Sequence, residues 1–388
     1  MDLTPATFDM DAWLDQRKLV VCVGAGGVGK TTTAATIALH GALRGRKTMV
    51  LTIDPARRLA NSLGLKSFGN EETRIDLDAL GHGEATGELW AMMLDSRSTF
   101  DTLIQRIAAD EAAKQRILNN HVYRHMADTF AGSQDYMATE KLYDLVAGGR
   151  YDLVVLDTPP VKNALDFLES PGRLIRFLDE RVLKWFLTPP ETGAFGRLMM
   201  GTTAVVYKLM GYIFGDEFLA DLQQFFQDFQ GLYQGFVERH KVVLELFRAP
   251  ETSFVTVCAP TESSLDVATF FQVELAAREL PRGGVVVNQV HSCDGATHDA
   301  KQVLGSVAEA VARDLPASTA PALLARLGMA HRRLHALQVA EDGLTERVRA
   351  AARGGGFYQE VARLDGNVHD LDSLLEVGRR LFQPAATL

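Results

Sequence analysis

The feature that most constrains this chain is a glycine-rich stretch near its start, Gly24–Thr32. It follows the apolar run Leu19–Val23 and precedes a helical pattern that begins at Thr33. The stretch matches G-x-x-x-x-G-K-[ST] in full, in the strand–turn–helix order that this motif requires. Glycines let the backbone approach phosphate groups, and the N–H groups and dipole of the following helix favour negative charge. We therefore expect a nucleoside triphosphate to bind here.

The side chains and the backbone of this loop have separate expected roles. Lys30 would reach the β- and γ-phosphates, and the Thr31 hydroxyl would bind Mg²⁺. The cradle for the phosphates would consist of backbone groups at Gly26, Gly27, Val28, Gly29, Lys30, Thr31 and Thr32.

Composition narrows the class of protein further. The 388 residues are 47% hydrophobic and 23% charged, which suits one large α/β domain with an insertion, or two subdomains. A formal net charge of −9 argues against a nucleic-acid partner, because neutralising phosphates needs a basic face. The first 16 residues hold no apolar core of signal-peptide length, and no run of 18 apolar residues occurs, so we expect a cytoplasmic protein.

The three cysteines are scattered along the chain, at Cys22, Cys258 and Cys293. None belongs to a C-x-x-C pair, which argues against a disulfide framework and against a zinc site built from cysteines. Cys22 and Cys258 lie in apolar runs, so we expect both to be buried, reduced core residues.

Short β-branched runs alternate with helical patterns, which predicts an α/β fold with a doubly wound, mainly parallel sheet of the P-loop NTPase class. Two helical blocks, at about residues 100–146 and 171–247, predict a helical subdomain inserted in a single domain of residues 18–388, after an N-terminal extension of residues 1–17. The predicted strands are Leu19–Val23, Thr48–Ile53, Leu89–Leu94, Leu153–Leu156, Ser253–Cys258, Gly284–Val287 and Tyr358–Leu364.

Two aspartates that follow predicted strands are candidates for the chemistry of hydrolysis. Asp54 stands at the carboxyl end of its strand, where open α/β sheets bind ligands, and would orient or deprotonate the attacking water. The alternative is a strand-end cap before Pro55. Asp157 follows four apolar residues in a Walker B-like arrangement and would hold Mg²⁺ directly or through water.

Together these motifs resemble the arsenite-transporter and tail-anchored-protein-targeting ATPases, which are P-loop proteins with a deviant Walker A motif. The matching segments are Gly26–Thr32, Asp54–Ala56 and Asp157–Pro160, and the resemblance spans about residues 18–382. It implies an enzyme that hydrolyses ATP to ADP and phosphate with Mg²⁺.

The resemblance also implies roles for individual residues. Asp54 would position the hydrolytic water, and Asp157 would belong to switch II. Asn288 would recognise adenine, which favours ATP over GTP, whereas the residues alone indicate a turn at this position.

Three departures from the family pattern change what is expected. Ala25 stands where the family has a lysine that crosses a dimer interface to the partner's γ-phosphate. Arg57 and Arg58 are the candidate arginine fingers to replace it, the alternative being ordinary surface arginines. The switch II threonine-glycine-histidine pattern is replaced by residues 161–164, Val-Lys-Asn-Ala. The soft thiolate ligands that bind arsenite are missing, so arsenical transport is not expected.

The resemblance and the helical blocks together suggest partners. A single P-loop implies a homodimer, or a heteromer with a lysine-bearing paralogous ATPase. An apolar or membrane-protein client would bind a groove lined by Met199, Met200, Met210 and Phe214, unless these residues pack in the subdomain's own core.

Three functions stay open. The leading one is a nucleotide switch that binds an apolar client. The second is a positioning ATPase related to septum-site and partition ATPases. The third is a regulatory module that binds ATP with little hydrolysis, which the alanine in the P-loop would permit.

Overall fold

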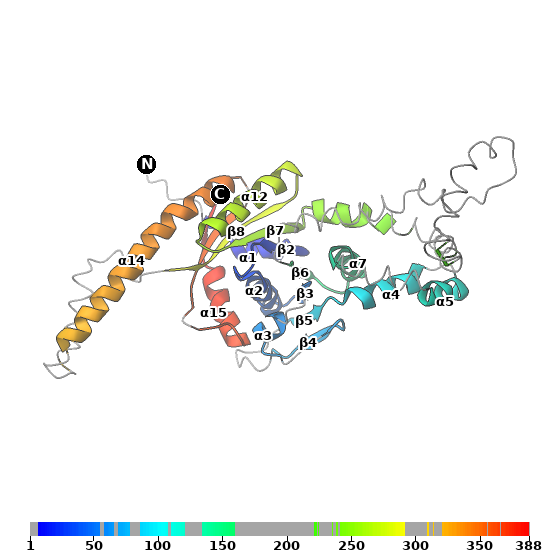
Figure 1. Cartoon of the computed structure of the whole chain (residues 1–388), viewed down its shortest axis with the longest axis horizontal. Coiled ribbons are helices and arrows are strands. Elements are labelled where there is room, and N and C mark those ends of the chain that lie inside the picture. Colours follow the sequence, from blue (N-terminus) through cyan, green and yellow to red (C-terminus); the bar gives the residue numbers. More distant parts are fainter. Residues whose placement is uncertain are drawn as a thin grey trace, which may run out of the picture.

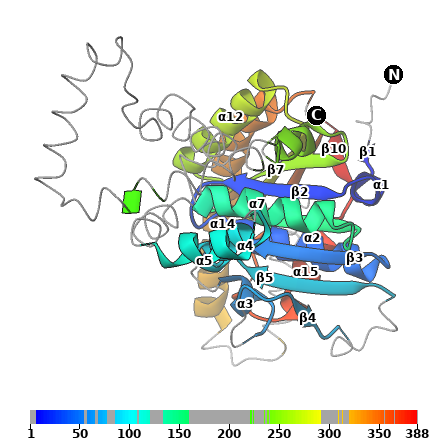
Figure 2. The same cartoon turned by 90° about the vertical axis from the view of Figure 1, so that its right-hand side faces the viewer.

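One sheet of ten strands organises the part of the chain that the structure describes (Figures 1 and 2). This computed structural model describes residues 7–54, 58–65, 69–77, 86–107, 110–120, 134–159, 241–291, 320–354, 356–364 and 366–387, with isolated residues between 221 and 239 and at 309 and 313. The spatial order is β1-β10-β9-β8-β7-β2-β6-β3-β5-β4. The strands are β1 Thr7–Phe8, β2 Leu19–Gly24, β3 Lys47–Thr52, β4 Thr73–Ile75, β5 Glu88–Met93, β6 Leu153–Asp157, β7 Thr252–Cys258, β8 Arg282–Val290, β9 Phe357–Ala362 and β10 Ala385–Thr387.

The predicted fold class is confirmed. Neighbouring strands pair in parallel from β9 through β8, β7, β2, β6 and β3 to β5, and the sheet is doubly wound about its centre. All seven predicted strands are present. Sequence patterning missed β1, β4 and β10, which are two or three residues long and pair antiparallel at the two ends of the sheet. Strands this short carry no alternation to detect.

Helices cover both faces of this sheet. Helices α4, α7 and α12 contribute side chains to one core, whereas α1, α2, α3 and α15 contribute to the core on the opposite face. The described helices are α1 Met10–Asp15, α2 Lys30–Leu43, α3 Arg58–Ser62, α4 Ser96–Ile107, α5 Glu111–Asn119, α7 Gln134–Ala147, α12 Glu262–Ala277, α14 Ala320–Ala351 and α15 Leu371–Leu381.

The central strand β2 shows how the sequence builds these two cores. Its side chains alternate between the faces, so Val21 packs with α7 and α12 while Val20 and Cys22 pack with α2 and α15. Every residue of β2 is buried, as expected for a parallel strand covered on both faces. Cys22 and Cys258 are buried free cysteines, which confirms that prediction; Cys293 lies outside the described residues.

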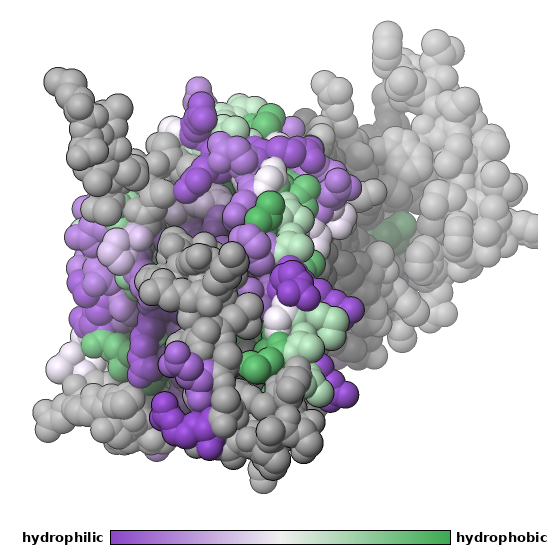
Figure 3. Space-filling model, turned by 90° about the vertical axis from the view of Figure 1, so that its left-hand side faces the viewer, coloured by the Kyte–Doolittle hydropathy of each residue, from purple (hydrophilic) through white to green (hydrophobic). Residues whose placement is uncertain are grey.

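Helix α14 is the longest described element, at 32 residues, and sequence patterning did not predict it. Its C-terminal part packs beside α12 and β8, with Val348 buried. Its other end projects from the sheet (Figure 1). Figure 3 views this side of the molecule, where apolar and hydrophilic residues are interspersed. Apolar side chains on α14 that remain exposed are Leu323, Leu327, Met329, Leu337 and Val339. No described helix combines the length and the apolar character that crossing a membrane requires.

The start of the described chain is packed onto the sheet. Trp13 of α1 is buried, and its ring lies edge-on to that of Phe357 at 4.9 Å between centroids. Within the proposed helical subdomain, α4, α5 and α7 occupy the first block, and residues 241–248 form the helical end of the second. Residues 160–220 lie outside the described part, and with them the candidate groove residues Met199, Met200, Met210 and Phe214.

Candidate functional site

The glycine-rich loop connects β2 directly to the N-terminus of α2. Its backbone needs glycine at both ends of the turn. Gly24 has φ +149°, and a Cβ there would collide with the carbonyl oxygen of Val257 on the neighbouring strand. Gly29 has φ +95° at the N-cap of α2, and a Cβ there would collide with Nδ2 of Asn288. The loop is therefore wrapped closely against β7 and β8, with the helix N-terminus open for an anion.

Lys30, the first residue of α2, folds back over this loop. Its Nζ donates a hydrogen bond to the carbonyl oxygen of Ala25 at 2.8 Å, and the residue is only 6% exposed. Burial lowers the pKa of the Lys30 ammonium, with Asp157 and Asp54 acting in the opposite direction. One N–H of the ammonium holds the loop, which leaves the other two as donors for phosphate oxygens.

Asp157 ends β6 next to the P-loop and is fully buried. The hydroxyls of Thr31 and Thr52 both donate to its Oδ2, at 2.7 and 2.9 Å. Its Oδ1 is buried and receives no hydrogen bond from any described residue. Burial raises the pKa of this carboxyl to about 6, against the lowering effect of the two hydroxyls.

This arrangement fits Mg²⁺. A carboxylate oxygen without a donor, beside a threonine hydroxyl, supplies the hard oxygen ligands that Mg²⁺ prefers. Among the described residues no three His, Cys, Asp or Glu side chains gather to hold a metal. Asp157 and Thr31 would thus share the ion with phosphates and water, as is usual for Mg²⁺ at nucleotide sites. The ion would neutralise charge on the β- and γ-phosphates.

Asp54 lies two residues beyond β3, at the carboxyl ends of the parallel strands, as Asp157 does. Its backbone N–H donates to Thr52 Oγ1 at 3.2 Å. Its carboxylate is 3.7 Å from the guanidinium of Arg58, four residues along the chain. The Asp54 side chain is 13% exposed and that of Arg58 is 55% exposed, so this pair is open to solvent on the arginine side. Arg57 lies outside the described residues.

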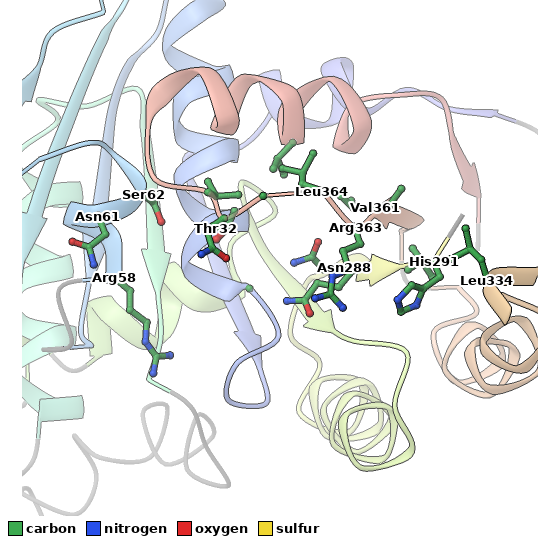
Figure 4. A pocket seen from close by; sticks show the side chains of 18 residues that line it. Thr32, Arg58, Asn61, Ser62, Asn288, His291, Leu334, Val361, Arg363 and Leu364 are labelled. Carbon is green, nitrogen blue, oxygen red and sulfur yellow. The ribbon is translucent and has the colours of Figure 1, made fainter. Parts of the chain in front are cut away.

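A pocket of about 940 Å³ continues from the P-loop along the ends of β8 and β9 (Figure 4). Asn288 reaches it from β8, and its Nδ2 donates to the carbonyl oxygen of Val28 at 2.9 Å. Gln289 adopts a positive φ of 65° beside it. Arg58, His291 and Arg363 bring nitrogen donors, and no Asp or Glu is among the described residues that line the pocket. This pocket is suited to a nucleoside whose phosphates lie in the loop.

One further contact ties this pocket to the projecting helix. The carboxylate of Glu341 on α14 accepts the backbone N–H of His291 at 2.8 Å, and its other oxygen lies 2.6 Å from His291 Nδ1. Sequence reasoning missed Thr52, His291, Glu341 and Arg363. A signal existed for Thr52 and Arg363, since each stands where a predicted strand ends on the ligand-binding edge. None existed for the pairing of His291 with Glu341, which are 50 residues apart.

The loop, the buried carboxylate and the sheet topology define a P-loop nucleotide-hydrolysing protein. Comparison with known proteins then identifies the particular group: the chain belongs to the anion-transporting ATPase family, whose model matches residues 17–302. The chain is accordingly an ATPase, and the resemblance deduced from its motifs is confirmed.

Several relatives cover most of the chain. It is 26% identical over 279 residues to a protein named ATPase GET3 from Podospora anserina, covering 71% of this chain and 75% of the relative. It is 29% identical over 283 residues to ATPase ARSA2 from Chlamydomonas reinhardtii, covering 71% and 69%. It is 25% identical over 279 residues to ATPase ASNA1 homolog 1 from Paramecium tetraurelia, covering 70% and 75%.

Proposed function

We propose that this ATPase is a Mg²⁺-dependent nucleotide switch in which ATP binding rearranges a pair of subunits and controls binding of an apolar client or partner. The proposed binding of Mg²⁺ and nucleotide rests on the buried Asp157 carboxylate, whose Oδ1 lacks a hydrogen-bond donor among the described residues. It lies against Thr31, at the start of the helix that also presents Lys30.

Each residue of the site has a separate proposed role. The amides of residues 26–32 and Lys30 hold the phosphates, while Thr31 and Asp157 hold Mg²⁺. Asp54 orients the water that attacks the γ-phosphate, because it stands at the carboxyl edge beside the P-loop with little exposure. Asn288 reads the adenine edge, for which an amide offers both a donor and an acceptor.

The charge on the transition state needs a source other than residue 25, which is alanine. Arg58 is the candidate among the described residues, since it lines the nucleotide pocket and approaches Asp54. Arg57 is the neighbouring alternative. An arginine finger acts either on the site of its own subunit or on that of a partner, and the exposed Arg58 side chain could do either.

Steady-state hydrolysis of ATP tests this assignment. Asp54→Asn keeps the size of the side chain and removes its charge, so kcat should fall by about 100-fold or more while the KM for ATP changes little. Asp266→Asn is a matched control, because Asp266 is an exposed aspartate on α12 that pairs with Arg347. Substantial and equal rates for wild type and Asp54→Asn would overturn the assignment. Near-zero hydrolysis in both, with ATP still bound, would favour a regulatory module.

A further inference from the structure

A single hydroxyl group, that of Thr52, contacts both the Asp157 carboxylate and the backbone N–H of Asp54. Thr52 is the last residue of β3 and lies directly opposite Asp157 in the parallel register with β6. Its Oγ1 is 2.9 Å from Asp157 Oδ2 and 3.2 Å from the backbone nitrogen of Asp54. Thr52 is 1% exposed, so no solvent competes for these bonds.

The direction of each bond follows from the chemistry of the groups. A hydroxyl has one proton and two lone pairs, and an ionised carboxylate only accepts. The Thr52 proton therefore goes to Asp157, and a lone pair receives the N–H of Asp54. One side chain joins the end of the Mg²⁺-binding strand to the segment that carries the water-orienting carboxylate.

We propose that Thr52 is a positioning residue that sets both carboxylates at once. By holding Oδ2 together with Thr31, it leaves Oδ1 of Asp157 as the oxygen free for the metal. By accepting the backbone N–H of Asp54, it fixes the backbone from which the Asp54 side chain extends. This inference rests on the roles proposed above for Asp54 and Asp157. A group that forms a hydrogen bond to a metal ligand orients that ligand.

The same strand supplies a matched control. Thr48 is also buried in β3, and its hydroxyl has no hydrogen-bond partner among the described residues. Burial of a threonine in this strand is thus tolerated without its hydroxyl being used. Replacing either threonine by valine keeps the β-branched shape and removes only the hydroxyl.

The experiment compares Thr52→Val, Thr52→Ser and Thr48→Val with wild type in steady-state hydrolysis of Mg²⁺-ATP. Thr52→Val should lower kcat by about 10-fold to 100-fold, which is the usual effect of removing a hydrogen bond to a metal ligand. The KM for ATP should be nearly unchanged. Thr52→Ser should retain most of the activity, and Thr48→Val should match wild type. In nucleotide-free protein treated with EDTA, hydrogen exchange at the Asp54 amide should be faster in Thr52→Val alone.

Two results would overturn the proposal. One is a wild-type kcat for Thr52→Val. The other is a loss of activity in Thr52→Val that Thr52→Ser does not restore and that follows a lowered melting temperature, since this indicates a structural role only. Asp54→Asn and Asp157→Asn, measured alongside, distinguish a failure of the role proposed for Thr52 from a failure of the proposed function. If both retain activity, the proposed function fails; if both lose it while Thr52→Val does not, only the role of Thr52 fails.

Discussion

At the scale of single residues, the carboxylate proposed to bind Mg²⁺ is placed at the expense of stability. Asp157 is buried, and two hydroxyl donors to Oδ2 do not compensate its charge fully. The result is a pKa raised to about 6 from an ordinary value of 3.8. In the empty protein at neutral pH, the charged carboxylate is less stable folded than unfolded. Binding a cation at Oδ1 would remove this penalty.

Asp157→Asn should therefore stabilise the nucleotide-free protein while abolishing hydrolysis. The amide oxygen still accepts from Thr31 and Thr52, but no charge is buried. The raised pKa sets an upper limit of about 3 kcal/mol on the gain in unfolding free energy at pH 7. Denaturant unfolding in EDTA measures it.

The sign of the pH dependence follows from the same shift. The folded protein holds the Asp157 proton more tightly than the unfolded chain, so wild type loses stability as pH rises from about 4 to about 6. The advantage of Asp157→Asn should be small near pH 4.5, should grow through pH 6 and should then level off. A variant that is less stable than wild type at pH 7 would contradict the prediction.

At the scale of elements, the ends of parallel strands assemble the site, and Glu341 attaches α14 to it. Asn288, three residues before His291, contacts the P-loop, while His291 is held by Glu341 of α14. The Glu341 side chain is 10% exposed and both of its oxygens are engaged. Movement of the β8 end on nucleotide binding would thus be transmitted to α14.

Glu341→Ala should weaken both the fold and the nucleotide site. It leaves the His291 N–H and ring without their acceptor, which costs about 1–3 kcal/mol for hydrogen bonds to a charged group. Glu346→Ala on the same helix is the control, because Glu346 is exposed and approaches Arg349 only at 3.8 Å; its cost should be under about 0.5 kcal/mol. Urea unfolding and ATP titration measure both effects. Equal costs for the two variants would contradict a special role for Glu341.

The elements also show what a sequence can and cannot predict. The P-loop and the central strands are local signals, because buried parallel strands are continuous apolar runs and the loop chemistry needs adjacent residues. The edge strands and α14 lack such patterns. The contact of Thr52 with Asp157 and the His291–Glu341 pair depend on which strands and helices become neighbours, and topology alone decides that.

At the scale of the whole molecule, the site opens at the carboxyl ends of the parallel strands, and among the described residues Lys30 is its only buried cation. Lys30 is the buried positive charge of the P-loop, and Ala25 contributes only a carbonyl oxygen to it. Arg58 is exposed near Asp54. A second subunit placed against this end of the sheet would exclude water from the site. Arg58 of either subunit could then reach the nucleotide of the other, which gives ATP a way to control assembly.

We expect Asp54→Asn, bound to ATP and Mg²⁺ without turnover, to have twice the mass of one chain by light scattering, and the nucleotide-free protein to have the mass of one. Arg58→Ala, made in the wild-type chain, should lower kcat by about 10-fold or more. Arg74→Ala should not, since Arg74 is an exposed arginine on β4, near Glu88 at the start of β5. A single-chain mass in both states would contradict a homodimer, and ATP hydrolysis gained only on adding a paralogous ATPase would indicate a heteromer.

The proposed binding of a client is tested on the same samples. The probe is a soluble reporter with one C-terminal apolar helix of about 20 residues, the length of a membrane span. Met199→Asp should abolish reporter binding without changing ATP affinity or dimer mass, because a charge in an apolar groove is costly to bury. Met329→Asp is the control, since Met329 is an exposed methionine on α14. If both variants bind the reporter as wild type does, the residues around Met199 are not the groove. If the wild-type protein itself does not bind the reporter, the dimer would act as a positioning switch that carries no client.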